Sequence, residues 1–522
     1  MVLEALFKSA ARTAPKASSI NHECAPAYEL DSRTALAQLA ATGCFGSTFY
    51  VSGQEQLGKV LEHAQKCDAA FVAKVAIDAR GRGFMKDMPA VLLAQLATRG
   101  PDGIAAMKAA FPRAIDNGRM LRNFVQVIRS GRLGRKSLGT APKNAVRRWL
   151  ASRSAMQLFR DSIGNDPSLV DVIKMVHPRP ASDEQRAMYG YLLGKAHDVG
   201  KLPAPVRLFE AWKRGEAEVA VPKVPSRMLA GLPLGKSEWK TIAQNARWHE
   251  TRMNLNTYQR HGVFDDKAMV EVIASRLADK DEVRKAKVFP YQLLVAWKMA
   301  SGVPGPIQEA LQDAMEHAVG NIPEIDGRVV ICPDVSGSMR GSVTGYRKGA
   351  TSAVQCVDVA GLIAAAFLRK NPLARVIPFE HDVRPLRVNP RDSVVTIAER
   401  LASIGGGGTN CSAPLSQLNK ERAKVDAIIY VSDNESWVDA RGGSACQRGT
   451  AMMDEWLELR RRNPQAKLVC IDLTPNTHTQ AIDRPDILNV GGFSDAVFDV
   501  VAQFVKADSP AHWAELIDRV EL

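Results

Sequence analysis

The pattern of apolar residues after about residue 326 constrains the fold of this chain more than any other feature. Short runs rich in apolar and β-branched residues alternate there with helical segments; the runs span 328–334, 374–380, 426–433 and 467–473. This alternation predicts a parallel, doubly wound α/β sheet, because a helix must carry the chain back to the start of each next strand. In such a sheet the loops at the carboxyl ends of the strands form the site.

The preceding part of the chain, from about residue 28 to 320, has helical hydrophobic spacing instead. In the segment 264–281, Asp265 or Asp266 is available as an N-cap. The apolar residues of this segment share one helical face, which consists of Met269, Val270, Ile273 and Leu277. Similar segments follow one another, separated by Gly and Pro, and strand-like runs are almost absent. We therefore expect an α-solenoid of paired helices, although no repeat unit is evident.

Length and composition indicate several domains. A chain of 522 residues exceeds what one core usually supports, and 46% hydrophobic with 24% charged residues is typical of globular domains. We expect a flexible N-terminal arm at 1–27, an all-α helical-repeat domain at 28–320 and the α/β domain at 321–522. The arm lacks the apolar core of a signal peptide, so we interpret it as mobile, with a transit peptide as the alternative. No apolar run is long enough to span a membrane.

Cysteine spacing and charge narrow the class of protein further. The eight cysteines include no CxxC pair, which argues against a zinc ribbon and indicates reduced thiols in a cytoplasmic protein. Of the 69 Lys and Arg and 56 Asp and Glu residues, 46 basic and 32 acidic residues lie before position 326. The helical part therefore carries all of the positive excess. A generally basic proteome is one explanation, and binding of nucleic-acid phosphate is the stronger one.

The loop after the first predicted strand carries a pattern of metal-ligating oxygens. Asp334, Ser336 and Ser338 are spaced two apart, and Thr409 and Asp433 follow in two further strand-end loops. A hard divalent ion needs about six oxygen ligands, so several loops must contribute. We expect Mg²⁺ here, with Mn²⁺ as the alternative. A serine-rich turn without an ion is the plainer interpretation.

In this order the three loops resemble the metal-ion-dependent adhesion site of von Willebrand factor A (vWA) domains. The resemblance implies that Ser336, Ser338 and Thr409 ligate the ion directly, and that Asp334 and Asp433 act mostly through water. It also implies binding rather than catalysis, since a partner's acidic side chain often completes such sites. A nucleophile elbow and a phosphate-binding loop both fail on glycine spacing.

The helical part contains dense basic segments that suit RNA phosphate. One segment, 127–154, carries no acidic residue. A second basic group lies at 284–287, and a third, at 245–262, interleaves basic side chains with Trp248 and Tyr258, which either stack on bases or belong to the core. From these segments we select as RNA-binding candidates Arg129, Arg132, Arg135, Lys136, Lys143, Arg147, Arg148, Arg284, Lys285 and Lys287.

A basic helical domain followed by a vWA domain resembles the Ro autoantigen family and its bacterial relatives, which carry the TROVE module. The blocks that match lie at 43–58, 81–97, 123–151, 168–180 and 284–298. The resemblance implies a monomeric ring of HEAT-like repeats closed by the vWA domain. By the same resemblance, 3′ ends of misfolded non-coding RNA enter the central hole, and Y-like RNA binds the outer surface at His177, Arg160 and Lys174. Gly164 stands where relatives often have a basic residue.

The expected function is that of a non-catalytic RNA-binding protein of RNA quality control. Bacterial relatives imply an adaptor role for an exoribonuclease. The alternative is a metal-dependent protein-binding adaptor for which RNA is incidental. A metal-dependent nuclease is a third possibility, but such enzymes usually gather more carboxylates than the two found in this motif.

Overall fold

The chain folds into two compact units. The computed structural model describes residues 14–42, 50–216, 220–286, 288, 290–319, 324–343, 354–438, 449–492, 495–506 and 513–522. One unit, the helical unit, comprises 67–288, 296–318 and 520–522. The other, the sheet unit, comprises 1–66, 289–295 and 319–519. None of the described helices is both long and apolar enough to cross a membrane.

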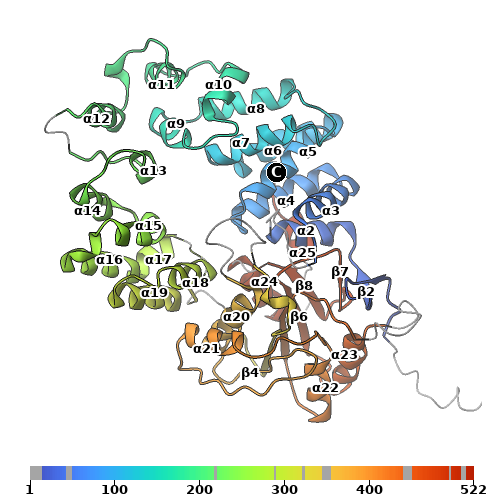
Figure 1. Ribbon diagram of the computed structural model, residues 1–522. Coiled ribbons are helices and arrows are strands. Elements are labelled where there is room, and N and C mark those ends of the chain that lie inside the picture. Colours follow the sequence, from blue (N-terminus) through green and yellow to red (C-terminus); the bar gives the residue numbers. More distant parts are fainter. Residues whose placement is uncertain are drawn as a thin grey trace, which may run out of the picture. The chain divides into compact units, whose positions relative to one another are not determined.

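The helical unit is a series of helices that pack mainly on their neighbours in the chain (Figure 1). Its helices are α4 (Ala69–Gly81), α5 (Asp87–Leu96), α6 (Gly100–Ala114), α7 (Gly118–Arg129), α8 (Thr140–Ala151), α9 (Ala155–Asp161), α10 (Leu169–Val176), α11 (Asp183–Leu193), α12 (Ala204–Lys213), α13 (Ser226–Leu229), α14 (Lys236–Asn245), α15 (Trp248–Arg260), α16 (Lys267–Ala278), α17 (Lys280–Ala286) and α19 (Gly305–Ala318). Helix α18 (Pro290–Met299) has residues in both units.

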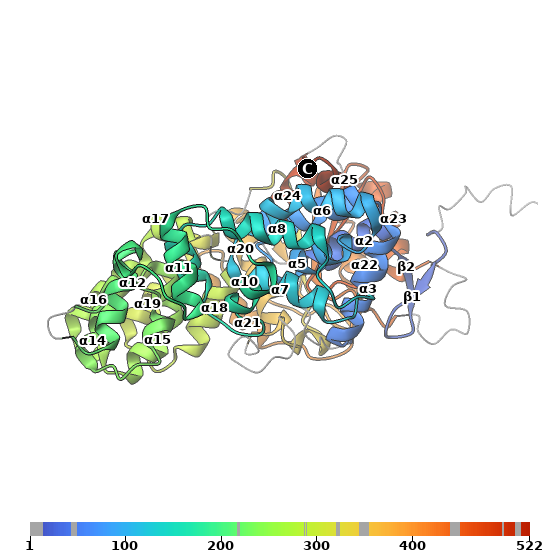
Figure 2. The same cartoon turned by 90° about the horizontal axis from the view of Figure 1, so that it is seen from above.

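Local sequence explains where these helices begin and which face they bury. The side chain of Asn117 accepts a hydrogen bond from the Met120 amide at 3.1 Å and so starts α7. Leu121, Phe124 and Ile128 of that helix are fully buried. Helix α4 packs on α5 and α6, α5 on α7, and α6 on α8, and in the later part of the series α16 packs on both α14 and α19 (Figure 2). Serial packing of this kind agrees with the predicted all-α arrangement of paired helices.

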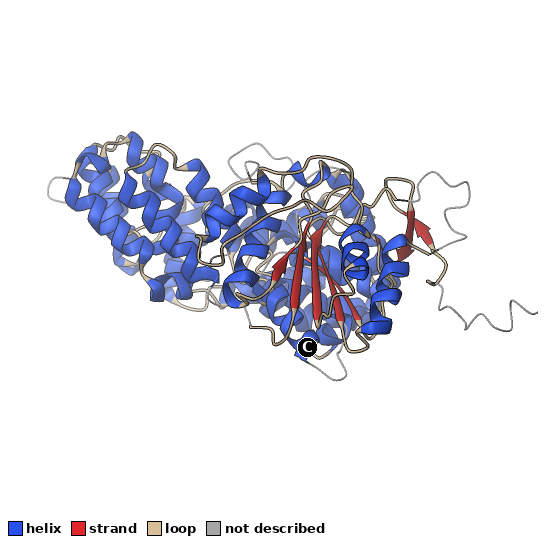
Figure 3. Cartoon of the chain, turned by 90° about the horizontal axis from the view of Figure 1, so that it is seen from below, coloured by secondary structure: helices blue, strands red, loops and turns tan. Residues whose placement is uncertain are grey.

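The sheet unit is built on a five-stranded parallel sheet in the order β4-β3-β5-β6-β8 (Figure 3). The strands are β3 (Val329–Pro333), β4 (Arg375–Val376), β5 (Ala427–Ser432), β6 (Lys467–Asp472) and β8 (Ile487–Gly491). The register pairs Val329 with Ala427 and Ala427 with Lys467. Nearly every residue of β3, β5, β6 and β8 is buried, as expected for parallel strands covered on both faces.

Helices cover both faces of this sheet, so the predicted doubly wound α/β domain is confirmed. On one face Trp456 and Leu415 pack with Tyr430 of β5 in a continuous core. On the other face Phe367 and Phe498 meet edge to face at 5.4 Å. The helices of the unit are α2 (Ser32–Thr42), α3 (Gly53–Lys66), α20 (Cys356–Lys370), α21 (Val394–Ala402), α22 (Ala413–Lys420), α23 (Ala451–Arg462), α24 (Asp495–Lys506) and α25 (Trp513–Asp518).

The N-terminal segment differs from the expected flexible arm at 1–27. Residues 14–29 include β1 (Ser19–Ile20) and β2 (Pro26–Glu29), and β2 pairs antiparallel with both β1 and β7 (His478–Thr479). Tyr28 is only 2% exposed and its hydroxyl donates to the Pro15 carbonyl at 2.8 Å. Helix α2 packs on β8 and α25. Residues 14–42 and 50–66 therefore belong structurally to the sheet unit, and residue 28 is not a boundary between compact units.

Candidate metal site and basic surface

The predicted metal-ligating side chains meet at the carboxyl ends of β3 and β5. These adjacent strands mark the switch point of the sheet, where chain connections leave in opposite directions and ligands of such folds usually bind. Asp334, Ser336 and Ser338 follow β3, and Asp433 follows β5. All four side chains are buried or nearly so.

The loop after β3 holds its polar atoms close together. The carboxylate of Asp334 accepts hydrogen bonds from the Ser336 amide at 2.8 Å and from the Ser432 hydroxyl at 2.6 Å. The hydroxyl oxygens of Ser336 and Ser338 are 3.3 Å apart, and Ser338 also donates to the carboxylate of Asp433. Both hydroxyls and both carboxylates therefore surround one small volume.

The glycine-rich loop 405–408, which leads into Thr409, lies against the loop after β3: the Gly337 amide donates to the Gly407 carbonyl at 2.8 Å. The Gly406 amide donates to the Val335 carbonyl at 2.8 Å, and the Thr409 carbonyl accepts from the Trp437 amide at 3.0 Å, beyond Asp433. Gly405 has a φ of +80°, and a Cβ there would lie 2.2 Å from the Val335 carbonyl oxygen. Only glycine meets both demands, and it lets this loop turn tightly against the loop after β3.

Burial makes the electrostatics of this group unusual. Burial raises the pKa of Asp334 to about 6, and burial together with the charge of Asp334 raises the pKa of Asp433 to about 8. Asp472, at the end of β6, has its pKa raised by burial and by the charge of Asp433. The hydrogen bonds to Asp334 come from neutral groups. Buried carboxyl groups that repel one another and face hydroxyl oxygens are suited to a hard divalent cation, which would relieve the repulsion.

Three further residues lie around the site that the spacing of residues in the strand-end loops did not predict: Tyr50, Glu380 and Asp472. The Tyr50 hydroxyl donates to Glu23 at 2.9 Å and lies beside Ser338; burial, then the charge of Asp433, raises its pKa. Glu380 accepts from the Gly407 amide at 2.7 Å and forms an ion pair with Arg384. Asp472 ends a predicted strand and so carried the same signal as Asp433.

In the helical unit, one hollow gathers two of the predicted cations. The hollow has a volume of about 480 Å³ and lies between α7 and α10, with Arg129 and Lys174 in its wall beside Asp171. Both cations are exposed, and their positive charge helps to lower the pKa of Asp171, after the hydrogen bonds from Ser168. The hollow thus presents two cationic side chains to solvent together with two acidic ones, Asp166 and Asp171.

The residues around the end of α10 combine structural and exposed groups. His177 is exposed and ends the helix in a left-handed conformation with a φ of 50°. Arg147 donates to the Val176 carbonyl beside it. At Gly164 a Cβ would lie 2.6 Å from the guanidinium of Arg122, which binds the Ile163 carbonyl at 2.7 Å. Glycine at this position fits both the positive φ of 113° and the close approach of the Arg122 guanidinium.

Not every predicted cation is free for phosphate. Arg135 is half-buried and donates to the carbonyl groups of Ser137 and Leu138, so its guanidinium shapes its own loop. On α17, Arg284 and Lys285 pair with acids of the same helix at 3.7 and 2.9 Å. Lys287 lies outside the described residues. The remaining predicted cations are exposed or half-buried on loop 130–139, α8 and α9: Arg132, Lys136, Lys143, Arg148 and Arg160.

A second and larger hollow lies among α9, α12, α13, α14 and α15. Its volume is about 760 Å³, and its lining includes Arg160, Lys223, Arg227 and Arg247. Arg160 was predicted from the family resemblance, whereas Lys223 and Arg227 were not selected. Trp248 and Tyr258, in contrast, are 2% and 0% exposed, so these two rings belong to the core and do not stack on bases.

Comparison with known proteins matches both parts of the chain. The family model "Ro60 vWA domain" matches residues 328–505, and the model "TROVE domain" matches residues 135–303. The RNA-binding protein RO60 of Deinococcus radiodurans is 27% identical over 516 residues, which cover 92% of this chain and 94% of that protein. RO60 of Caenorhabditis elegans is 24% identical over 260 residues, which cover 47% of this chain and 38% of that protein.

A solved structure shows the same fold. The crystal structure of the D. radiodurans RO (RSR) protein superposes with a TM-score of 0.63 at 24% identity, covering 91% of this chain and 99% of that one. The two family models lie in the order that the sequence resemblance predicted. The chain therefore belongs to the Ro family, with a TROVE domain followed by a Ro60-type vWA domain.

Proposed function

We propose that this chain is a non-catalytic RNA-binding protein that holds RNA on the cationic surface of its helical unit. The observation that carries the proposal is the hollow between α7 and α10, where Arg129 and Lys174 face solvent. The similarity of the chain to the RNA-binding protein RO60 of D. radiodurans supports it. Phosphate neutralisation by such side chains supplies most sequence-independent affinity.

The finer proposal concerns which RNA is bound and for what purpose. The chain binds small Y-like RNAs on the surface around His177 and Lys174, and it binds single-stranded 3′ ends of misfolded RNA. It acts as a monomer in RNA quality control and presents these RNAs to an exoribonuclease. Exposed His177, at the end of the helix whose Lys174 lines the hollow, supports the first part.

Sequencing the RNA that copurifies with the full chain tests this proposal. We expect small structured RNAs and RNAs with single-stranded 3′ tails to be enriched over total RNA. Copurified RNA with the composition of the total pool would contradict the proposed selectivity. Light scattering of the RNA-free protein measures the proposed monomeric state.

We also propose that Asp334, Ser336, Ser338, Thr409 and Asp433 hold a divalent cation, Mg²⁺ or alternatively Mn²⁺. Mutual repulsion of the buried carboxyl groups and the facing hydroxyl oxygens support this. When bound, the ion supplies a positive centre for an acidic ligand. The chain's own residues position that centre: Ser432 fixes the Asp334 carboxylate, and the glycine loop carries Thr409.

A protein-binding adaptor is the competing function, because an acidic partner side chain would complete this cation site. Asp334→Ala separates the two functions. If RNA binding is the main function, this variant keeps wild-type RNA affinity in filter binding. If RNA is incidental, it loses capture of a protein partner while charge reversal in the hollow has no effect on that capture.

A further inference from the structure

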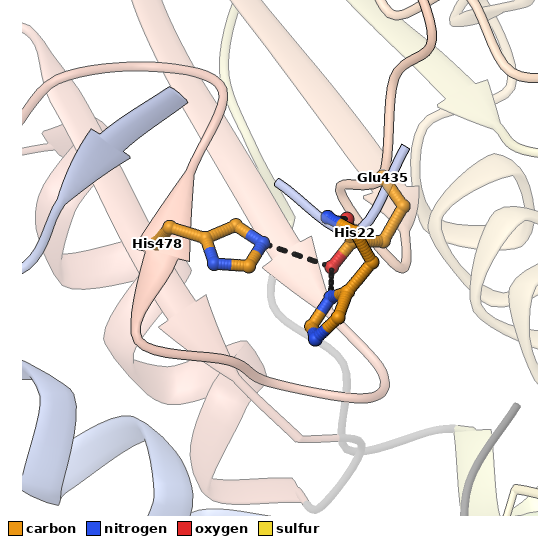
Figure 4. Close-up of side chains that lie close together, drawn as sticks. All are labelled: His22, Glu435 and His478. Carbon is orange, nitrogen blue, oxygen red and sulfur yellow. Dashed lines mark hydrogen bonds and ion pairs between the residues drawn. The ribbon is translucent and has the colours of Figure 1, made fainter. Parts of the chain in front are cut away.

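The proposed cation site of Asp334, Ser336, Ser338, Thr409 and Asp433 is called the oxygen site below. A second cluster of potential metal ligands lies outside it, where the N-terminal segment meets the vWA domain (Figure 4). His22 lies in the turn between β1 and β2, Glu435 in the loop after β5, and His478 in β7. His22 Nδ1 is 2.8 Å from Glu435 Oε1, and His478 Nε2 is 2.9 Å from the same oxygen. The three potential ligand atoms lie within 4.8 Å of one another.

The surrounding contacts hold these three groups in place. Pairing of β2 with β7 sets Glu29 opposite His478, and the Asn21 side chain donates to the Ser436 carbonyl at 2.6 Å. The second carboxylate oxygen of Glu435 accepts from the His22 amide at 2.9 Å. The Glu435 side chain is fully buried, whereas that of His22 is 28% exposed, which leaves access from solvent.

The donor set differs in kind from that of the oxygen site. Two imidazole nitrogens and one carboxylate oxygen suit a borderline ion such as Zn²⁺ or Co²⁺, while Mg²⁺ prefers oxygen ligands alone. Zinc ligands at about 2.0 to 2.2 Å from the ion lie about 3.3 Å from one another. The present hydrogen-bonded separations are therefore a few tenths of an ångström short, so each ring would move slightly outward and transfer its proton to its other nitrogen.

We propose that His22, Glu435 and His478 bind a zinc-class ion that fastens the N-terminal segment to the vWA domain. Asn476 is the nearest further donor: its amide nitrogen lies 2.9 Å from Glu435 Oε1, and turning the amide places its oxygen there as a fourth ligand. Because His22 and His478 are distant in sequence, the ion joins the N-terminal segment to β7, in the C-terminal part of the chain.

Cobalt spectroscopy on the full chain tests the site. Cys24 is exposed and only two residues from His22, so all variants carry Cys24→Ser to remove its thiolate. Co²⁺ is titrated in excess Mg²⁺, which occupies an oxygen-only site. We expect the intense visible bands of four- or five-coordinate Co²⁺, saturating at one equivalent and displaced by Zn²⁺.

Matched variants assign the ligands. His22→Gln and His478→Gln should weaken Co²⁺ binding at least tenfold and abolish the rise in unfolding temperature that Zn²⁺ produces. His197→Gln, a histidine of the helical unit, and Asp334→Ala should leave both readouts unchanged. Circular dichroism checks folding; if His478→Gln unfolds, the partly exposed His22 decides the result. Bands that are absent, that survive both histidine variants, or that disappear in Asp334→Ala would overturn the proposal and leave a hydrogen-bonded cluster without an ion.

Discussion

Reversing the two cations of the hollow between α7 and α10 tests the proposed RNA surface. In Arg129→Glu/Lys174→Glu, two exposed attractive contacts become repulsive beside Asp171, which already lines the hollow. A contact between exposed charges in water is worth about 1 kcal/mol before screening. Exchanging attraction for repulsion at both positions should therefore cost about 2 to 3 kcal/mol, or roughly 30- to 150-fold in affinity.

Filter binding of a labelled RNA between about 50 and 200 mM salt measures both affinity and mechanism. Each single-strand phosphate contact contributes about 0.7 to the slope of log affinity against log salt, so the slope should fall by about 1.4. A control with the same charge change, Lys420→Glu/Arg461→Glu in the sheet unit, should keep both quantities near wild type. Equal losses in the two double variants, or an unchanged salt slope, would refute the reasoning.

Three further predictions concern the sheet unit. Asp334→Ala should lose the rise in unfolding temperature that Mg²⁺ gives the wild type in differential scanning fluorimetry; an equal rise would contradict the cation site. Gly405→Ala should destabilise the domain by about 1 to 3 kcal/mol in urea unfolding, because it combines a positive φ with a clash at the Val335 carbonyl. Burial would raise the pKa of Asp486, but hydrogen bonds from Arg484 and Trp456 outweigh it and lower this pKa. Its carboxylate therefore stabilises the fold above the unfolded pKa of about 4, and this contribution is lost as pH falls through the lower folded value. Asp486→Asn should lower the free energy of unfolding by about 2 to 3 kcal/mol at pH 7 and by less in acid. A loss that is the same at pH 7 and below the folded pKa would contradict the stabilising role of the Asp486 carboxylate.

The strands that the sequence revealed are those whose burial on both faces leaves a continuous apolar run. β3, β5 and β6 are of this kind. The predicted run 374–380 gives only the two-residue strand β4 at the edge of the sheet, although beyond it the Ile377 and Phe379 amides still donate to the Ile331 and Pro333 carbonyls of β3. β8 carries the polar Asn489 and follows a proline-rich turn, which obscured its pattern.

The N-terminal segment could not be placed from its own residues. Ala27 is small, and its strand β2 completes a sheet with β7, whose residues lie in the C-terminal part of the chain. Local pattern carries no information about such a distant partner. For the same reason His22 gave no sign that it would meet Glu435.

The oxygen site was more predictable because its geometry follows from the sheet. Asp334 and Asp433 end adjacent parallel strands, so their loops must lie side by side. Tyr50 and Glu380 reach the same place from segments with no spacing rule to connect them. In the helical unit, periodicity identified the helices but not the surroundings of each cation: Arg135 donates to a carbonyl group of its own loop, whereas Lys174 lines a hollow.

Ultraviolet cross-linking of bound RNA to the full chain, followed by mass spectrometry of the linked peptides, most directly tests where RNA is held. Cross-links should concentrate in residues 126–177 of the helical unit and weaken as salt rises. They should be sparse in residues 328–343 and 405–438, where the proposed cation site lies. Cross-links concentrated in those vWA loops, with none between Arg129 and His177, would contradict the division of roles between the two units.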